Sequence, residues 1–277
     1  MPASRNRLEQ LARLGYAARG AVSLIVGGLA LLAAFGQGGE ATGSKGALQA
    51  LMAQPLGEIL LVVVALGLFG FALWRACQAV LDADAEGRSA KALAVRGGRA
   101  LASVTYVSLG IFALGLIFAT GRGADEEQSA QDWTAWLLAQ PFGRWLVAGV
   151  GLAIIGAAIG MAAKAWTASF RRHLACGPAA SWVVPLGRAG FAARAVVFLL
   201  VGGFLLVAAW QTDPSEARGL GGALEALQQQ PYGRAMFALV ALGLAAFGAF
   251  NFAQARFRRI ATPEAGEVAA AVRAGTA

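Results

Sequence analysis

Charged residues divide the chain into long apolar segments. The runs without Asp, Glu, Lys or Arg that are long enough to matter are 20–39, 59–74, 100–121, 145–163, 195–212 and 235–255. About 20 apolar residues, at a rise of about 1.5 Å each, cross a hydrocarbon core of roughly 30 Å. The run 59–74 is short, but its helix can continue past Arg75 to Leu81, because a long arginine side chain extends to the headgroups. The pattern predicts six transmembrane helices.

The composition agrees with a membrane protein. Of the 277 residues, 58% are hydrophobic and 14% are charged, whereas about 25% are charged in an ordinary soluble domain. The mean hydropathy is +0.61. Two cysteines, and 37 glycines without a three-residue period, exclude a disulfide-stapled secreted domain and a collagen-like chain. The expected class is an all-α membrane protein.

Lys and Arg gather on alternate sides of the predicted spans. One side holds Arg5, Arg7, Arg13, Arg88, Lys91, Arg96, Arg99, Arg171, Arg172, Arg188, Arg256, Arg258, Arg259 and Arg273. The other holds Lys45, Arg122, Arg144, Arg218 and Arg234. Just inside the ends of spans on the first side lie Arg19, Arg75, Lys164 and Arg194. Because basic residues stay on the cytoplasmic side, we expect both termini in the cytoplasm. The net charge of +8 then faces anionic headgroups rather than nucleic acid.

A unit of two spans occurs three times. Its strongest marker is Gln-Pro-x-Gly, with glutamines at Gln54, Gln140 and Gln230, prolines at Pro55, Pro141 and Pro231, and glycines at Gly57, Gly143 and Gly233. The odd-numbered spans open at Gly15, Gly98 and Gly190. Arg19 and Arg194 each follow such a glycine by four residues, whereas Ala102 takes that place in the second copy. A repeat of this kind predicts that the chain is built from three copies of one structural unit.

The markers set the predicted boundaries. Between cytoplasmic segments 1–10 and 261–277 we expect repeat 1 over 11–82 (spans about 17–36 and 57–81), repeat 2 over 94–174 (spans about 100–121 and 143–167) and repeat 3 over 184–260 (spans about 190–211 and 233–255). Two-span units must all point the same way through the membrane, and parallel repeats are related by an axis along its normal. We therefore expect a pseudo-threefold bundle.

A short stretch with apolar residues on one face precedes each Gln-Pro, at 47–51, 135–138 and 223–227. We expect short interfacial helices on the outer side, each ended by the proline, which then starts the next span. In the fourth span, small residues recur at helical spacing: Gly149, Ala153, Gly156, Ala157, Gly160 and Ala163. Small faces allow close approach in lipid, so this stripe predicts tight helix packing.

These motifs resemble a known family. Gly-Tyr-Ala-Ala-Arg-Gly at 15–20, Gly-Ala-Leu-Gln-Ala-Leu at 46–51, Ala-Leu-Gly-Leu-Phe-Gly at 65–70 and the tripled Gln-Pro-x-Gly are similar to the bacterial membrane family called domain of unknown function 1206. The resemblance covers about residues 11–260. It implies an integral protein of a bacterial cytoplasmic (inner) membrane with tandem two-span units, and it brings no activity and no catalytic residues.

Reactive groups are sparse. His173 is the only histidine and stands in a basic loop, while Cys77 and Cys176 fit no metal or redox spacing. No charged residue is expected at mid-depth, which disfavours a pump with a buried carboxylate. Hydroxyls within the spans, such as Thr105, are expected to bond to their own helix backbone. We therefore expect no enzyme, no catalytic, cofactor-binding or metal-binding residue, and no cofactor.

Two functions fit this pattern. The first is a non-enzymatic scaffold that contacts the lipid bilayer, anionic headgroups on the cytoplasmic face and a membrane protein partner. The second is a channel or facilitator for a small solute along the threefold axis. In that case Gln54, Gln140 and Gln230 would ring the outer mouth, unless each caps its own short helix. A dry axis would favour the first function and a polar lumen the second.

Overall fold

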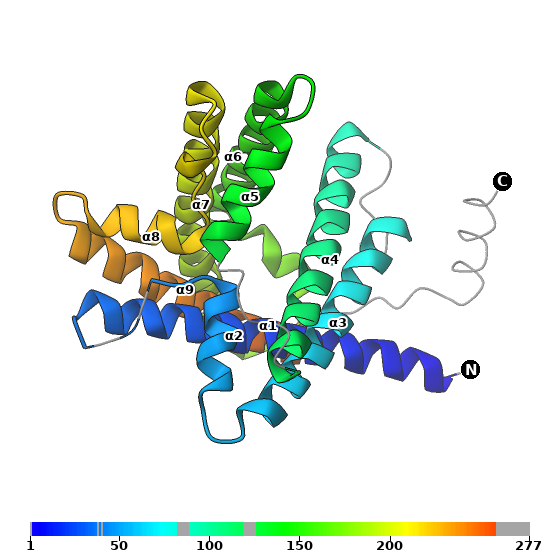
Figure 1. The fold of residues 1–277 in the computed structure, drawn as a ribbon. Helices are drawn as coiled ribbons and strands as arrows, with labels where there is room; N and C mark the ends of the chain where they lie inside the picture. The colour runs from blue at the N-terminus through cyan, green and yellow to red at the C-terminus, as the bar shows by residue number, and fades with distance from the viewer. Residues whose placement is uncertain (1, 38, 40, 82–88, 119–125, 259–277) are drawn as a thin grey trace.

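Six long helices dominate the computed structural model, which describes residues 2–37, 39, 41–81, 89–118 and 126–258 (Figure 1). Those long and apolar enough to cross a membrane are α1 (Pro2–Ala34), α3 (Gly57–Val80), α4 (Ala90–Ile117), α6 (Gly143–Thr167), α7 (Ala180–Gln211) and α9 (Gly233–Phe257). The prediction of six apolar spans in an all-helical chain is confirmed at this level. The expected cytoplasmic tail 261–277 and the charges Arg88, Arg122, Arg259 and Arg273 lie outside the described residues.

Shorter helices connect the long ones. The three that precede the Gln-Pro motifs are α2 (Ser44–Met52), α5 (Glu126–Leu138) and α8 (Leu220–Gln228). Single 3-10 turns are η1 (Ser169–His173), η2 (Gly177–Ala179) and η3 (Pro214–Glu216). α2 and α8 each bury apolar residues of one face, Leu48 and Leu224 among them. Each two-span repeat thus has its own short helix at the same place in the sequence.

The Gln-Pro-x-Gly elbows have one shared geometry. The residue before each glycine is the N-cap of the next helix and takes a left-handed conformation, with φ of 64° at Leu56, 61° at Phe142 and 61° at Tyr232. The helix therefore begins at the glycine, and the prediction that the proline starts its first turn is wrong. A Cβ at Gly57 would collide with the carbonyl group of Met52, so the fourth motif position must be glycine.

The long helices pack in a defined order. α1 lies against α9, α3 against α4 and α6 against α7, while α1 also packs on α3 and α7 on α9 (Figure 1). The two long helices of the first repeat are thus in contact, and so are those of the third. In the described part of the chain, α4 and α6 of the second repeat do not pack against each other in this way. The ring of helix contacts is open at one side.

Glycines account for the two contacts within repeats. A Cβ added at Gly15 would lie 2.7 Å from Cα of Phe71, and one added at Gly190 would lie 2.6 Å from Cα of Phe247. Gly98, the equivalent residue of the second repeat, has no atom within 4 Å of such a Cβ. Small residues allow close approach only where a second helix lies opposite them. In the second repeat, no described helix lies against the Gly98 face of α4.

The small-residue stripe of α6 is part of that empty face. A Cβ added at Gly149, Gly156 or Gly160 would meet no atom within 4 Å. The prediction that this stripe mediates tight packing is therefore wrong for this chain. The contact of α6 with α7 instead uses Gly151, whose added Cβ would lie 3.1 Å from the Gly202 carbonyl oxygen.

Three equivalent arginines fasten each repeat to the one before it. Each stands two residues before the opening glycine of its repeat, and each donates to carbonyl groups at the end of the second long helix of a neighbouring repeat, α9, α3 or α6. The bonds are Arg13 Nη1 to Ala255 O (2.6 Å), Arg96 Nε to Ala79 O (2.7 Å) and Arg188 Nη2 to Trp166 O (3.3 Å). The first of these links α1 to α9, so the pattern is cyclic. We call these three contacts the arginine clasps. A cation also interacts favourably with a helix C-terminus.

The Arg96 clasp gives a first prediction. Arg96→Ala removes the bonds to the carbonyl groups of Ala79 and Val80, which are 2.7 and 2.9 Å long. Hydrogen bonds from charged donors contribute about 1.5–3 kcal/mol, so we expect a loss of about 2 kcal/mol in thermal unfolding of the detergent-purified protein. Arg234→Ala, at an exposed arginine, is the control and should change stability by less than about 0.5 kcal/mol. Equal losses would contradict a clasping role.

Candidate functional site: a half-buried arginine cluster

Three arginines of the first and third repeats approach one another inside the bundle. They are Arg19 from α1, Arg75 from α3 and Arg194 from α7. Arg19 and Arg194 lie against the same Phe247 ring, and Arg19 and Arg75 lie against the same Phe71 ring. We call them the arginine cluster. The Nε atom of each is buried and donates no hydrogen bond. Arg75 Nη1 donates to Gln78 Oε1 at 3.1 Å, and Arg19 interacts with the hydroxyl of Tyr106.

Aromatic rings frame the cluster. The Arg19 guanidinium carbon lies 4.8 Å from the ring centroid of Phe247, 5.2 Å from Phe71 and 5.7 Å from Tyr106. Arg194 lies 4.7 Å from the same Phe247 ring. Cation–π contacts of this kind contribute about 0.5–2 kcal/mol when they are removed from water. The rings therefore position the guanidinium groups, although they carry no countercharge.

The cluster has no acidic partner in the described part of the chain. None of its three arginines forms an ion pair there, whereas the peripheral Arg13 pairs with Glu9 at 2.7 Å. The three side chains are half-buried, with buried Nε atoms, and shielding unpaired charge from water is costly. The three cations also repel one another. An anion placed among them would remove both penalties. Guanidinium groups match the geometry of phosphate and carboxylate oxygens, so the arrangement is suited to hold such a group.

The depth of the cluster follows from helix geometry. Arg19 stands 15 residues before the end of α1 at Ala34, which is about 22 Å along the axis at about 1.5 Å per residue. Arg194 stands 17 residues before the end of α7 at Gln211, or about 25 Å. A hydrocarbon core of roughly 30 Å that begins at the C-terminal ends of α1 and α7 would hold both residues in the third that lies farthest from those ends. From the sequence, the two arginines were expected just inside the cytoplasmic ends of their spans, and nothing in the sequence indicated that they meet.

The phenylalanines of the cluster were missed by sequence reasoning. Phe71 and Phe247 each stand sixteen residues after the elbow proline of their repeat, at Pro55 and Pro231. The register of the repeat could therefore have identified them. In the second repeat the same position is Ala157, so that repeat lacks both the arginine and the ring.

The three elbow glutamines do not form a joint site. Gln54 and Gln230 are exposed, and Gln140 Nε2 donates to Trp136 O at 3.3 Å, within its own repeat. Among the described residues, no hydrogen bond joins the three side chains. The backbone carbonyl groups of the three glutamines accept from the backbone N–H groups of the elbow glycines, as in Gly57 N to Gln54 O at 2.9 Å.

A cap of short helices lies at the elbow end of the bundle. α5 contacts both α2 and α8. Lys45 Nζ donates to Ser129 Oγ at 2.6 Å, and the backbone N–H of Gly219, the N-cap of α8, donates to Glu127 Oε2 at 2.9 Å. In the η3 turn, bonds from the hydroxyl and N–H of Ser215 lower the pKa of Asp213.

Beneath this cap lies a continuous apolar core. It joins side chains of α1, α2, α3, α4, α7, α8 and α9, including Val26, Leu48, Leu61, Leu224 and Phe237. The arginine cluster lies toward the opposite end of α1 and α7. The interior thus changes from apolar at the capped end to cationic and aromatic near the other.

Hydroxyls within the long helices behave in two ways. Thr105 Oγ1 donates to Leu101 O at 3.0 Å, as expected. Ser103 Oγ instead donates across to Ala72 O of α3 at 2.8 Å, which helps to fasten α4 to α3. Neither residue belongs to the arginine cluster.

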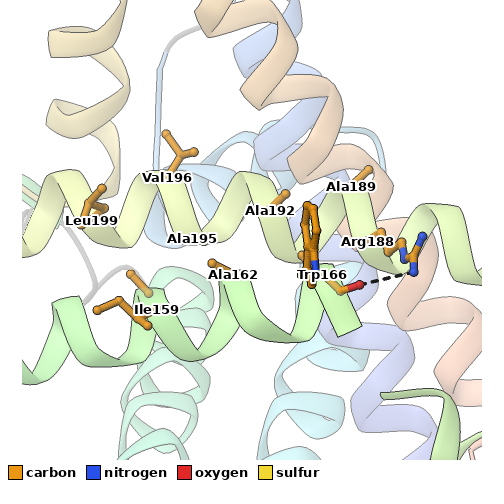
Figure 2. Close-up of a pocket in the computed structure, with 11 residues that line it drawn as sticks. Ile159, Ala162, Trp166, Arg188, Ala189, Ala192, Ala195, Val196 and Leu199 are labelled. Atoms are coloured by element: carbon orange, nitrogen blue, oxygen red, sulfur yellow. Dashed lines mark hydrogen bonds between the residues drawn. The ribbon is translucent and has the colours of Figure 1, made fainter. Parts of the chain in front are cut away.

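An apolar groove runs along the outside of α6 and α7 (Figure 2). It has a volume of about 620 Å³, and alanines form most of its lining. Ile159 lies toward one end, and at the other Arg188 clasps the Trp166 carbonyl group. No member of the arginine cluster lines it.

The residues considered for metal or thiol chemistry form no cluster in the described part of the chain. Among the described residues, no group of three or more His, Cys, Asp and Glu side chains could hold a metal ion. Cys77 and Cys176 are free thiols, and burial raises the pKa of the Cys176 thiol. The side chain of His173 lies outside the described part of the structure.

Comparisons with known proteins agree with the repeat architecture. The model of a family described as Domain of Unknown Function (DUF1206) matches residues 14–82, 93–168 and 189–258. Uncharacterized protein YxxB of Bacillus subtilis (strain 168) is 36% identical over 247 residues, which cover 88% of this chain and 88% of that protein. No solved structure matches. The chain therefore belongs to the DUF1206 family, whose domain it carries in three tandem copies.

Proposed function

We propose that this protein is a non-enzymatic, multi-pass protein of the bacterial cytoplasmic membrane that binds an anion carrying a phosphate group at the arginine cluster. The observation that carries the proposal is the set of three arginines that share the Phe71 and Phe247 rings and form no ion pair in the described chain. A phosphate group would accept from guanidinium groups on several sides. The source of that phosphate is either a lipid headgroup or a soluble compound.

The proposed arrangement is a pseudo-threefold bundle with the short helices on the outer interface and both termini in the cytoplasm. The cyclic clasps of Arg13, Arg96 and Arg188 support the threefold relation. The excess of basic residues near the clasped ends supports the orientation. In this orientation the arginine cluster lies on the cytoplasmic side of the membrane centre, close to the anionic leaflet.

The apolar core under the cap favours binding over passage. A channel along the axis would need water or polar groups through the capped half, where residues such as Val26, Leu61 and Phe237 are buried together. Passage of a small solute is the second candidate function. Flux assays in proteoliposomes test it, and we expect no leak of ions or small solutes above that of empty vesicles.

The binding proposal is tested with two cluster arginines. The variant Arg19→Gln/Arg194→Gln keeps side chains of polar character but removes two positive charges. We expect the wild-type protein in mixed micelles to retain phosphatidylglycerol, or to bind glycerol phosphate, at least tenfold more tightly than the variant does. Native mass spectrometry measures the retained phosphatidylglycerol, and thermal shift measures the binding of glycerol phosphate.

Arg144→Gln/Arg234→Gln is the matched control, because these two arginines are exposed and lie beside the elbows. It removes the same charge and should bind both probes like the wild-type protein. The proposal fails if the cluster variant binds both probes as tightly as the control does.

A further inference from the structure

The second repeat exposes helix faces that the other repeats bury. On α4 the exposed positions are Gly98, Leu101 and Thr105. Their equivalents are buried in both other repeats, as Gly15, Ala18 and Val22 on α1, and as Gly190, Ala193 and Val197 on α7. The difference is therefore not a property of the repeat in general. It follows from the separation of α4 and α6.

α6 lacks the large side chains that the second long helix of each other repeat carries. α3 carries Phe71 and Trp74 at the positions where α9 carries Phe247 and Phe250, and all four rings are buried. The same two positions of α6 are Ala157 and Gly160, which are exposed. Each large ring buries about 150–250 Å², so this loss removes the groups that hold the long helices of the other repeats together. We call the exposed residues of α4 and α6 the open faces.

The open faces belong to the repeat that also lacks the cluster's charges. Where repeats 1 and 3 have Arg19 and Arg194, the second repeat has Ala102, and where α3 has Arg75, α6 has Met161. Its contribution to the cluster is Tyr106 of α4, whose ring centroid lies 4.7 Å from that of Phe71 and 5.7 Å from the Arg19 guanidinium carbon. Tyr106 thus connects the cluster to the helix that bears one open face.

We infer that the ligand of the arginine cluster is an anionic phospholipid that enters from the bilayer between α4 and α6. This inference rests on the proposed function and names its ligand. The phosphate accepts from Arg19 and Arg194, while an acyl chain lies along the small residues of α6 in the space that aromatic rings fill in the other repeats. Charge complementarity selects an anionic headgroup, and the apolar path selects a molecule with acyl chains over a soluble phosphate.

The groove between α6 and α7 is a different surface. It lies along another side of α6, where Ile159 and Ala162 point into it (Figure 2). It is apolar and exposed, so lipid chains contact it, but it leads to the clasp of Arg188 and not to the cluster. It therefore supplies a control position at the same depth on the same helix.

The first test places aromatic rings on the open face of α6. Ala157→Phe/Gly160→Phe restores rings at the two positions where the other repeats have them. We expect at least tenfold weaker binding of phosphatidylglycerol from mixed micelles and unchanged binding of soluble glycerol phosphate. Ile159→Phe adds a ring of the same kind in the other groove and should leave both affinities unchanged.

The outcomes separate this inference from the proposed function. If Arg19→Gln/Arg194→Gln weakens binding but Ala157→Phe/Gly160→Phe leaves phosphatidylglycerol binding intact, the entry route and the lipid assignment are overturned and the anion site stands. If the arginine variant weakens neither probe, both proposals fall.

A second measurement does not depend on the folding of the double-ring variant. A bimane label on Ala157→Cys, in a Cys77→Ser/Cys176→Ser background, reports contact with brominated acyl chains. We expect brominated phosphatidylglycerol to quench the label at least twofold more strongly than equally brominated phosphatidylcholine. A label on Ile159→Cys should be quenched equally by both. Equal quenching at position 157 would overturn the inference.

Discussion

Gly190→Leu is expected to abolish stable packing of the third repeat. A Cβ at this position would lie 2.6 Å from Cα and 2.7 Å from Cβ of Phe247, so the side chain cannot be accommodated by a rotamer change of Phe247 alone. α7 and α9 would have to separate along their crossing. Overpacking commonly costs about 1–3 kcal/mol, and we expect more than about 3 kcal/mol here because the obstacle is backbone. Thermal unfolding and aggregation after detergent extraction measure the effect.

The second repeat provides the control for this substitution. Gly98→Leu is made at the equivalent position of α4, where no atom lies within 4 Å of an added Cβ. Leucine favours a helix over glycine by nearly 1 kcal/mol, so stability should stay equal or rise slightly. If both variants lose stability to the same extent, the crossing of α7 and α9 is not what makes the glycine necessary.

Arg19→Met/Arg194→Met is expected to make the ligand-free protein more stable. Both arginines are half-buried and form no ion pair in the described chain, and replacement of buried charged groups by apolar residues of similar volume is often neutral or gains about 1–4 kcal/mol. We expect a gain toward the lower end of this range. The lost cation–π contacts offset part of this gain. We expect a higher unfolding temperature in lipid-free neutral detergent, measured by intrinsic fluorescence of the tryptophans.

The same variant should lose the response to anionic lipid. A ligand at about 100 times its Kd stabilises the folded state by about 2.7 kcal/mol. Phosphatidylglycerol should therefore raise the unfolding temperature of the wild-type protein and leave that of the variant unchanged. A variant that is less stable than the wild-type protein without lipid would contradict this view, because it would show that the arginines serve the fold through their aromatic contacts.

Periodic features of the chain could be predicted from sequence. The six long helices, the short helix before each elbow and the three copies of the unit all depend on patterns that recur in the sequence, such as Gln-Pro-x-Gly and the opening glycines. The position of each elbow could be predicted, but its backbone conformation could not. Its left-handed residue is Leu56, Phe142 or Tyr232, none of which is a residue type that favours positive φ.

Contacts between helices could not be predicted, because they depend on what stands opposite each face. Gly156 and Gly160 have the spacing of a packing motif, but α4 does not lie against them. Conversely, Arg96 was interpreted only as a cytoplasmic charge, although it fastens α4 to the end of α3. The approach of Arg19 to Arg194 likewise arises from the packing of α1 and α7 on α9, which no local pattern contains.

The Arg13 clasp has a consequence for the order in which the protein assembles. It joins α1 to α9, and α9 follows the other described helices in chain order. The side of α1 that includes Gly20 and Gly27 packs against Gly248 and Ala245 of α9, so it lacks this partner in the growing chain until α9 has been translated. Contacts this distant in sequence form late. Translation of α9, rather than insertion of α1, therefore sets the earliest moment at which these helices can close into the bundle.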